Sequence, residues 1–234
     1  MVNYFFFNNK SSLDFGVFIS GESSWKKPQK RVDKYKIPGK DGTLSISDGT
    51  FENIEIPYNC SIIEDFTRNF DALSAFLMST EGYQKFEDTY HPNYYRLARY
   101  DGAIEAEMTQ LNRHGQFQLV FDFDPRQFLK DGDKFNEIAT GADIYNAYLF
   151  DAKPTLRVYG TGTITVGSIS VVVTTANGYT DIDCQLQEAY KGATSCNGNI
   201  TLTNGEFPKL KPGSNIITFS GFTKVEIATH FWTI

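Results

Sequence analysis

The sequence predicts a mainly β protein, with an α+β first domain and an antiparallel β-sandwich as the second domain. Three observations carry this prediction. Aromatic residues make up 15% of the 234 residues, with 20 Phe and 13 Tyr against 2 Trp, and such side chains suit a pleated, half-buried surface. The first half contains one amphipathic helical pattern. The second half contains only short strand-like segments separated by glycine-containing turns.

The helix is the best-marked element of the first half. Its large apolar residues recur at i, i+4, i+7 and i+11, namely Phe66, Phe70, Leu73 and Leu77. This spacing places them on one helix face. Asp65 or Thr67 is expected to cap the N-terminus, and Gly82 lies just past the expected end. A single amphipathic helix among strands must lay its apolar stripe on a sheet, which makes this half α+β.

A strand followed by a polar stretch marks the expected domain boundary. Apolar residues at every second position, Phe117 to Phe123, predict a strand with one buried face. Pro125 is expected to end it, because proline cannot donate a ladder hydrogen bond. The polar, glycine-containing stretch 130–134 follows. We therefore expect a first domain over residues 1–130, a joint over 131–153 and a second domain over 154–234.

The second domain reads as a series of short strands. We expect them at residues 156–159, 163–166, 168–174, 199–202, 215–219 and 224–227. Turns are expected between them at 160–162, 177–178, 197–198, 204–205 and 211–213, where Gly, Asn and Pro supply the required backbone conformations. Strands punctuated this often indicate an antiparallel sandwich.

The residues that usually carry catalysis are scattered. His91, His114 and His230 lie in distant segments without metal-ligand spacing, so roles in turns or on strand surfaces are expected for them. A triad assembled across the fold remains open, but no nucleophile-elbow motif supports one. The carboxylate pairs Asp122/Asp124 and Asp181/Asp183 each flank a core-facing residue and are expected on solvated strand faces. We expect no catalytic residue and no enzymatic activity.

Cofactor and metal sites are not expected either. The short glycine motifs at 39–42 and 160–162 lack the context of a phosphate-binding loop. Cys60, Cys184 and Cys196 are odd in number and widely spaced, which argues against a zinc site or a disulfide framework. Free buried thiols are the expectation, and a Cys184–Cys196 bridge stays open as an alternative.

Charge and hydropathy limit the possible partners. The net charge of −6 gives no long-range attraction to nucleic acid or anionic lipid, so no sequence-specific nucleic-acid binding is expected. No apolar run approaches the roughly 20 residues of a membrane span. The run Tyr4–Phe7 is also too short for a signal-peptide core, so we expect synthesis and folding in the cytoplasm.

One basic cluster interrupts this acidic background between Lys26 and Lys40. A solvated strand and loop, an electrostatic contact with another protein, and nucleic-acid binding all remain possible for it. Its basic residues do not gather on one strand face. As subunit-interface candidates we single out Lys30, Arg31, Lys34, Lys36 and Lys40.

Five segments, in this order, resemble motifs of the siphophage distal tail proteins. They are residues 37–44 (IPGKDGTL), 91–96 (HPNYYR), 121–129 (FDFDPRQFL), 153–162 (KPTLRVYGTG) and 207–221 (FPKLKPGSNIITFSG). Together they span nearly the whole chain. The last strand departs from the family pattern, because residues 228–232 (ATHFW) stand where relatives often carry Pro-Arg-Trp.

The resemblance implies a structural viral protein of the phage tail. It implies an N-terminal β-sandwich with one helix and an extended hairpin, which closes into a hexameric ring, and a galectin-like or carbohydrate-module-like C-terminal sandwich. The ring would join the tail tube to the tail-tip or baseplate hub protein in the virion, after assembly in the host cytoplasm. DNA would pass through its centre, and we expect an acidic or mixed lumen that gives phosphates no grip.

Three alternative functions remain. The first is a tail protein that binds host cell-wall carbohydrate through the second domain, although the one tryptophan of that half, Trp232, is expected to pack in the core. The second is a tail-tube subunit, which would polymerise into long cylinders where a distal ring closes. The third is a glycan hydrolase of the tail tip.

Overall fold

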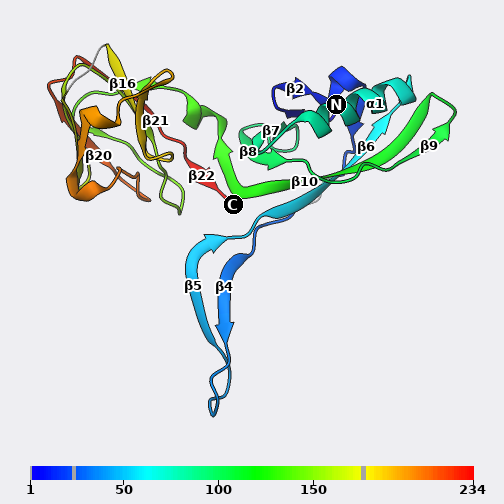
Figure 1. Ribbon diagram of the computed structural model, residues 1–234, viewed down its shortest axis with the longest axis horizontal. Helices are drawn as coiled ribbons and strands as arrows, with labels where there is room; N and C mark the ends of the chain where they lie inside the picture. Colours follow the sequence, from blue (N-terminus) through cyan, green and yellow to red (C-terminus); the bar gives the residue numbers. More distant parts are fainter. Residues whose placement is uncertain (1, 23–24, 175–177) are drawn as a thin grey trace. The chain divides into compact units, whose positions relative to one another are not determined.

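The computed structural model describes residues 2–22, 25–174 and 178–234, and it divides into two compact units (Figure 1). The first unit comprises residues 1–127 together with Ile234, and the second comprises residues 128–233. Strands account for 49% of the residues and helices for 12%, so the predicted mainly β class is confirmed. Within the described ranges, no helix has the length and hydrophobicity of a membrane span.

The first unit is built on one curled antiparallel sheet. Its strands follow the order β2-β1-β7-β8-β10-β6-β3, with β9 paired to β10. The bounds are β1 Phe5–Phe7, β2 Lys10–Ser11, β3 Val17–Ile19, β6 Ile54–Ile62, β7 Gln84–Asp88, β8 Tyr94–Arg99, β9 Ala106–Gln110 and β10 His114–Leu129. The 3-10 helix η1, Ser12–Phe15, and the separate hairpin β4 Lys30–Tyr35 and β5 Leu44–Phe51 complete the unit.

The predicted helix is α1, Phe66–Ser79, and it packs on the inner face of this sheet. Phe66, Leu73 and Leu77 are buried as expected, and Phe70 packs at the edge of the core. The expected side-chain cap from Asp65 is wrong, because Asp65 adopts a left-handed backbone conformation and makes no capping hydrogen bond.

Asn112, in the β9–β10 turn, caps α1 instead. Its side-chain Oδ1 accepts from the backbone N–H of Thr67 at 3.2 Å, and its carbonyl accepts from the N–H of Phe66 at 3.3 Å. Two N–H groups at the start of the helix therefore find their acceptors in a residue about 45 positions further along the chain. Local sequence spacing cannot reveal such a contact.

The strand predicted at residues 117–123 is the centre of β10, and its alternating residues are buried. The expectation that Pro125 ends the strand is wrong, because β10 continues to Leu129. The pairing of β10 with β6 ends at Phe123, opposite Ile54, so Pro125 lies beyond the ladder to β6 and no bond to that strand is lost.

The second unit is an antiparallel sandwich of two sheets around one core. One sheet has the order β11-β21-β13-β16-β17-β18, and the other has the order β12-β20-β14-β15-β19. The bounds are β11 Asn136–Glu137, β12 Ala142–Asp143, β13 Thr155–Tyr159, β14 Gly162–Val166, β15 Ile169–Val173, β16 Tyr179–Asp183, β17 Glu188–Lys191, β18 Thr194–Ser195, β19 Ile200–Leu202, β20 Ile216–Ser220 and β21 Lys224–Ala228. The short strand β22, Trp232–Thr233, belongs to neither of these sheets and pairs with β10. Three short 3-10 helices are η2 Lys130–Asp133, η3 Asn197–Asn199 and η4 Thr203–Gly205.

All six strands expected in the second half are present as β13, β14, β15, β19, β20 and β21. The chain reverses between β13 and β14 at Gly160, whose φ is 95°, and at Gly162 a Cβ would lie 2.1 Å from the carbonyl oxygen of Ser220. Only glycine permits this approach of two backbones. Of the turn expected at 177–178, Asn177 lies outside the described residues.

Residues 131–153, expected to be a joint, contribute to both sheets of the sandwich. The edge strand β11 pairs with β21 and β12 pairs with β20, while Ile138 and Ile144 pack against the core. Asn146 is 1% exposed, and its amide donates to the carbonyls of Phe150 and Leu210. Two-residue edge strands have no side-chain periodicity, which is why the segment resembles a linker in the sequence.

Candidate assembly surface

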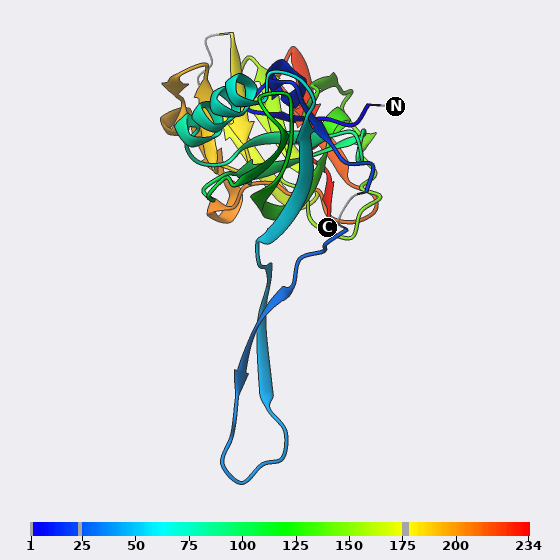
Figure 2. The same ribbon diagram turned by 90° about the vertical axis from the view of Figure 1, so that its right-hand side faces the viewer.

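The hairpin β4–β5 carries the basic residues singled out in the sequence, and it stands out from the sheet of the first unit (Figures 1 and 2). Every residue from 29 to 50 is exposed, and the two strands pair only with each other. An isolated two-stranded hairpin is marginally stable in water, because it buries little apolar surface. This hairpin is therefore a surface that lacks a covering partner within its own unit.

The register of the hairpin brings three exposed apolar side chains together on one side. Residues that face each other across a pair share one side of the ribbon, and here Tyr35 pairs with Leu44 and Asp33 with Ile46. On that side Tyr35, Leu44 and Ile46 are 52%, 43% and 53% exposed. The opposite side carries Lys34 paired with Ser45. One side of the hairpin thus gathers three apolar side chains beside Asp33, and the other carries Lys34 and Val32 opposite Ser45 and Ser47.

A bulge twists the base of the hairpin. Between the pairs Lys30–Phe51 and Val32–Ser47, β5 holds two more residues than β4, and Gly49 adopts a φ of 80°. The carboxylate of Asp48 accepts from both the side chain and the backbone of Thr50, and these hydrogen bonds lower the pKa of Asp48, with a smaller contribution from Arg31.

The five interface candidates lie together on this exposed hairpin. Arg31 has the negative charge of Asp48 nearby. Among the described residues, no ion pair involves the other four: Lys30, Lys34, Lys36 and Lys40. Their charges are therefore available to an acidic surface, and their place at a subunit contact stays a prediction.

Sequence reasoning missed the apolar side of the hairpin. The signal was present in Leu44-Ser45-Ile46-Ser47, where apolar and hydroxyl residues alternate with period 2. It was overlooked because the basic residues of the facing strand dominate the composition of this region. The strand pairing is needed to show that Tyr35 joins Leu44 and Ile46 on one side.

The three histidines each hold local structure. In the β7–β8 turn, Asp88 Oδ1 accepts from the backbone N–H of His91 at 2.8 Å and lies 3.1 Å from its Nδ1. His114 contacts the hydroxyl of Thr109 across the β9–β10 turn. The expected turn and strand roles fit both contacts.

His230 takes part in a hydroxyl–imidazole–carboxylate chain that resembles a catalytic triad in connectivity. Its Nε2 lies 3.0 Å from Thr155 Oγ1 and its Nδ1 lies 3.1 Å from Asp133 Oδ1. Thr155 is only 5% exposed, within β13, so its hydroxyl cannot meet a substrate. These hydrogen bonds hold Asp133 and His230 against β13, and they supply no accessible nucleophile.

The expectation of solvated carboxylate faces is wrong for Asp181, which is buried, whereas Asp122, Asp124 and Asp183 are half-buried. Asp181 is 4% exposed and holds Arg157 in two hydrogen bonds. The side chain of Asp122 is 13% exposed and accepts from Arg99 Nε at 2.8 Å, with Asn53 and Tyr83 as further donors. Strand alternation places a side chain on the outer face, but it does not show which neighbours cover it.

The cysteines are free thiols: Cys60 and Cys184 are buried, and Cys196 is half-buried. Burial raises the pKa of Cys60 to about 12, and burial also raises that of Cys184. The alternative Cys184–Cys196 bridge is not formed. Within the part of the chain that the structure describes, no three His, Cys, Asp or Glu side chains are placed to hold a metal ion.

Comparison with known proteins identifies the fold. No protein-family model and no curated protein matches the sequence. Among solved structures, the chain is similar to the Dit protein of phage SPP1, a paradigm of the hub adsorption apparatus in phages that infect Gram-positive bacteria. The TM-score is 0.78 at 16% identity, and the alignment covers 100% of both chains.

Two structures of the phage P2 baseplate in its activated conformation, with calcium and with strontium, are also similar. Their TM-scores are 0.58 and 0.57, at 12% and 11% identity, and the alignments cover 97% of this chain and 97% and 96% of theirs. The fold of this chain is therefore of the Dit type over its whole length, because the alignment includes both units.

Proposed function

We propose that this chain is a structural component of a siphophage tail, a distal tail protein that joins the tail tube to the tail tip or baseplate. The observation that carries the proposal is the match to the Dit hub protein, which extends over 100% of both chains and so includes the hairpin and both units. Its place in the virion tail, its tail-tube and baseplate partners and its synthesis in the host cytoplasm are part of this proposal.

The hairpin is the proposed contact between subunits. Its apolar side, Tyr35, Leu44 and Ile46, would be covered by a neighbouring copy, and its basic residues would meet acidic groups of that copy, whose net charge is negative. A surface that cannot be covered by its own unit favours a closed, repeated contact, because each copy then covers the hairpin of the next. We propose a hexameric ring with a central channel for DNA.

A non-enzymatic role is part of the same proposal. The triad-like chain at His230 begins at a buried hydroxyl, and His91 is held by Asp88 in a turn. Carbohydrate binding is less well supported, since Trp232 stacks on Phe150 at 4.3 Å and its indole N–H donates to the carbonyl of Asp151. Phe150 therefore covers one face of the indole, which leaves less aromatic surface for a sugar.

The experiment is the mass of the purified full chain by light scattering, with negative-stain imaging. We expect closed rings of several copies. Leu44→Ser with Ile46→Ser should shift the mass toward single subunits, and Lys34→Gln with Lys36→Gln should weaken assembly at moderate salt. Ile63→Ser, an equally exposed apolar residue outside the hairpin, is the matched control and should leave the rings intact.

Two results would contradict the proposal. A wild-type chain that stays single at all concentrations would exclude self-assembly into rings, and long cylinders would favour a tail-tube subunit. Rings that survive both hairpin double variants would place the subunit contact elsewhere.

A further inference from the structure

Arg96 is a buried cation on the inner face of the first unit's sheet. It lies on β8 opposite Phe86 of β7, and it is only 8% exposed. Its guanidinium carbon lies 5.8 Å from the centroid of the Phe123 ring. Arginine stays protonated in proteins, so a full positive charge is enclosed here largely by aromatic side chains.

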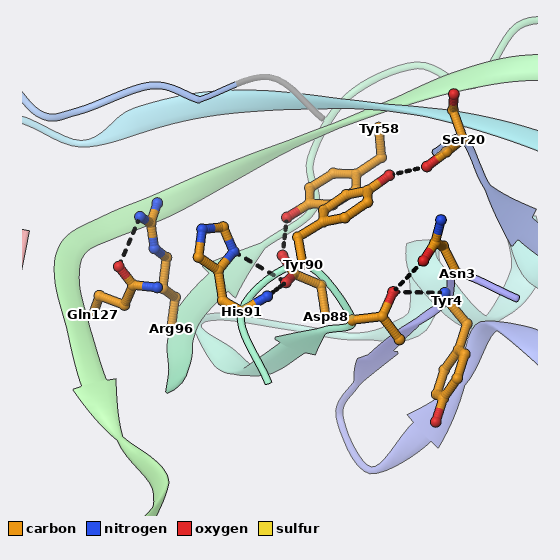
Figure 3. Close-up of polar contacts among 10 residues, drawn as sticks. Asn3, Tyr4, Ser20, Tyr58, Asp88, Tyr90, His91, Arg96 and Gln127 are labelled. Atoms are coloured by element: carbon orange, nitrogen blue, oxygen red, sulfur yellow. Dashed lines mark hydrogen bonds and ion pairs between the residues drawn. The ribbon is translucent and has the colours of Figure 1, made fainter. Parts of the chain in front are cut away.

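The guanidinium lies beside the side-chain amide of Gln127, and Figure 3 shows their hydrogen bond. Nη2 donates to Gln127 Oε1 at 3.4 Å, and Nη1 has no hydrogen-bond partner among the described residues. The charge of Asp88 attracts Arg96, but the Asp88 oxygens already accept from the Tyr58 hydroxyl at 2.8 Å and from His91. No described carboxylate forms an ion pair with Arg96.

Arg157 in the second unit is an arginine of the same protein that does have a carboxylate partner. It makes two hydrogen bonds to one carboxylate, and these raise its pKa. For Arg96, burial lowers the pKa and outweighs the attraction of Tyr58 and Asp88. A water molecule could accept from Nη1, but it would leave the buried charge without a counter-charge.

A pocket opens beside this unpaired donor. The pocket is small and partly open to solvent, and it is lined by Arg96 and Gln127 together with Tyr94, Tyr95 and Glu22. A second cation lies near, because both burial and the charge of Arg96 lower the pKa of Lys27. Guanidinium and primary amide N–H groups both donate hydrogen bonds to carboxylate oxygens, and a charged guanidinium makes the stronger of these bonds.

We propose that this pocket is a receptor for one carboxylate group, bound by Arg96 Nη1 with help from the Gln127 amide. The carboxylate comes either from a free organic acid or from an Asp or Glu side chain of another protein chain. The site lies within the first unit and does not depend on ring assembly by the hairpin.

Gln127→Glu tests the site without removing the arginine. It would place a carboxylate where Oε1 now stands, 3.4 Å from Nη2, and so fill the site from within. In the wild type, acetate should raise the melting temperature by roughly 2–4 °C over chloride at equal ionic strength. Gln127→Glu should melt higher than the wild type and lose the acetate response, and Arg96→Met should lose that response too. An equal acetate response in all three chains would overturn the proposal.

A crystal structure of the full chain grown in acetate separates the two sources. An acetate on Nη1 supports a free acid, and an acidic side chain of a neighbouring chain on Nη1 supports a protein partner. Water alone, chloride alone, or the chain's own Glu22 on Nη1 would overturn the proposal. Glu22→Gln is the control in solution and should keep the full acetate response, since Glu22 lines the pocket without serving as the ligand.

Discussion

Arg157 and Asp181 form a two-fold hydrogen-bonded ion pair between neighbouring strands, with Nε to Oδ1 at 2.6 Å and Nη2 to Oδ2 at 2.9 Å. The guanidinium carbon also lies 4.1 Å and 4.7 Å from the ring centroids of Phe135 and Tyr179. The pair ties β13 to β16 and covers the outer face of the second unit's larger sheet with a cation between two rings.

Asp181→Asn should therefore destabilise the second unit. The expected loss in the free energy of unfolding is about 2 kcal/mol, below that of a fully buried pair, because the Arg157 side chain is 27% exposed. Calorimetry of the full chain measures the loss. Glu188→Gln, an exposed carboxylate on the adjacent strand β17, is the control, and an equal loss in both variants would contradict a specific role for the pair.

Gly115→Ala should destabilise the first unit. A Cβ at this position would lie 2.2 Å from Cε2 of Phe66, the buried first residue of α1, so helix and sheet would have to separate. We expect a loss of about 1–3 kcal/mol in the free energy of unfolding. Gly102→Ala meets nothing closer than 3.8 Å and should be nearly neutral in the same urea titration. A Gly115→Ala protein as stable as the wild type would show that α1 is not fixed by this contact.

Stability at acid pH should depend on Asp88. Burial alone would raise its pKa, but hydrogen bonds from His91 and Tyr58 outweigh burial and lower it below the ordinary value of 3.8. A lowered folded-state pKa adds stability that is present above 3.8 and lost as the pH falls through the folded value.

Asp88→Asn should accordingly lower the free energy of unfolding at pH 6 by roughly 2 kcal/mol relative to the wild type. This difference between the wild type and the variant should narrow below pH 3.8. Urea titrations between pH 2.5 and 6 measure it. A gap that stays constant over this range would mean that the charged form of Asp88 contributes nothing.

The thiols should differ in reactivity. Cys60 and Cys184 are buried with raised pKa values, so few thiolates form there and reagents cannot reach them. Iodoacetamide at pH 8 should modify Cys196 alone in the folded chain, and all three cysteines in urea. Peptide mass spectrometry identifies the sites, and Cys196→Ser should abolish the native reaction. Modification of Cys60 before Cys196 would indicate local opening of the first core.

The class of the fold and its best-marked elements follow from the amino-acid sequence alone. Periodicity found α1 and six strands of the sandwich, because an apolar face must recur every 3.6 residues on a helix and every 2 on a strand. Ordered motifs along the chain indicated the fold type that the whole-chain match now supports. These features are local, so they can be read without knowing which segments meet.

The tertiary structure alone decided which side chains act together. Asn112 caps a helix from 45 residues away, and Asp181 lies under Arg157 where a solvated face was expected. The apolar side of the hairpin exists only once Tyr35 is paired with Leu44, and the unpaired Arg96 is visible only once its neighbours are in place. Each depends on contacts between distant segments, and the burial and charge balance of a side chain are set by those contacts.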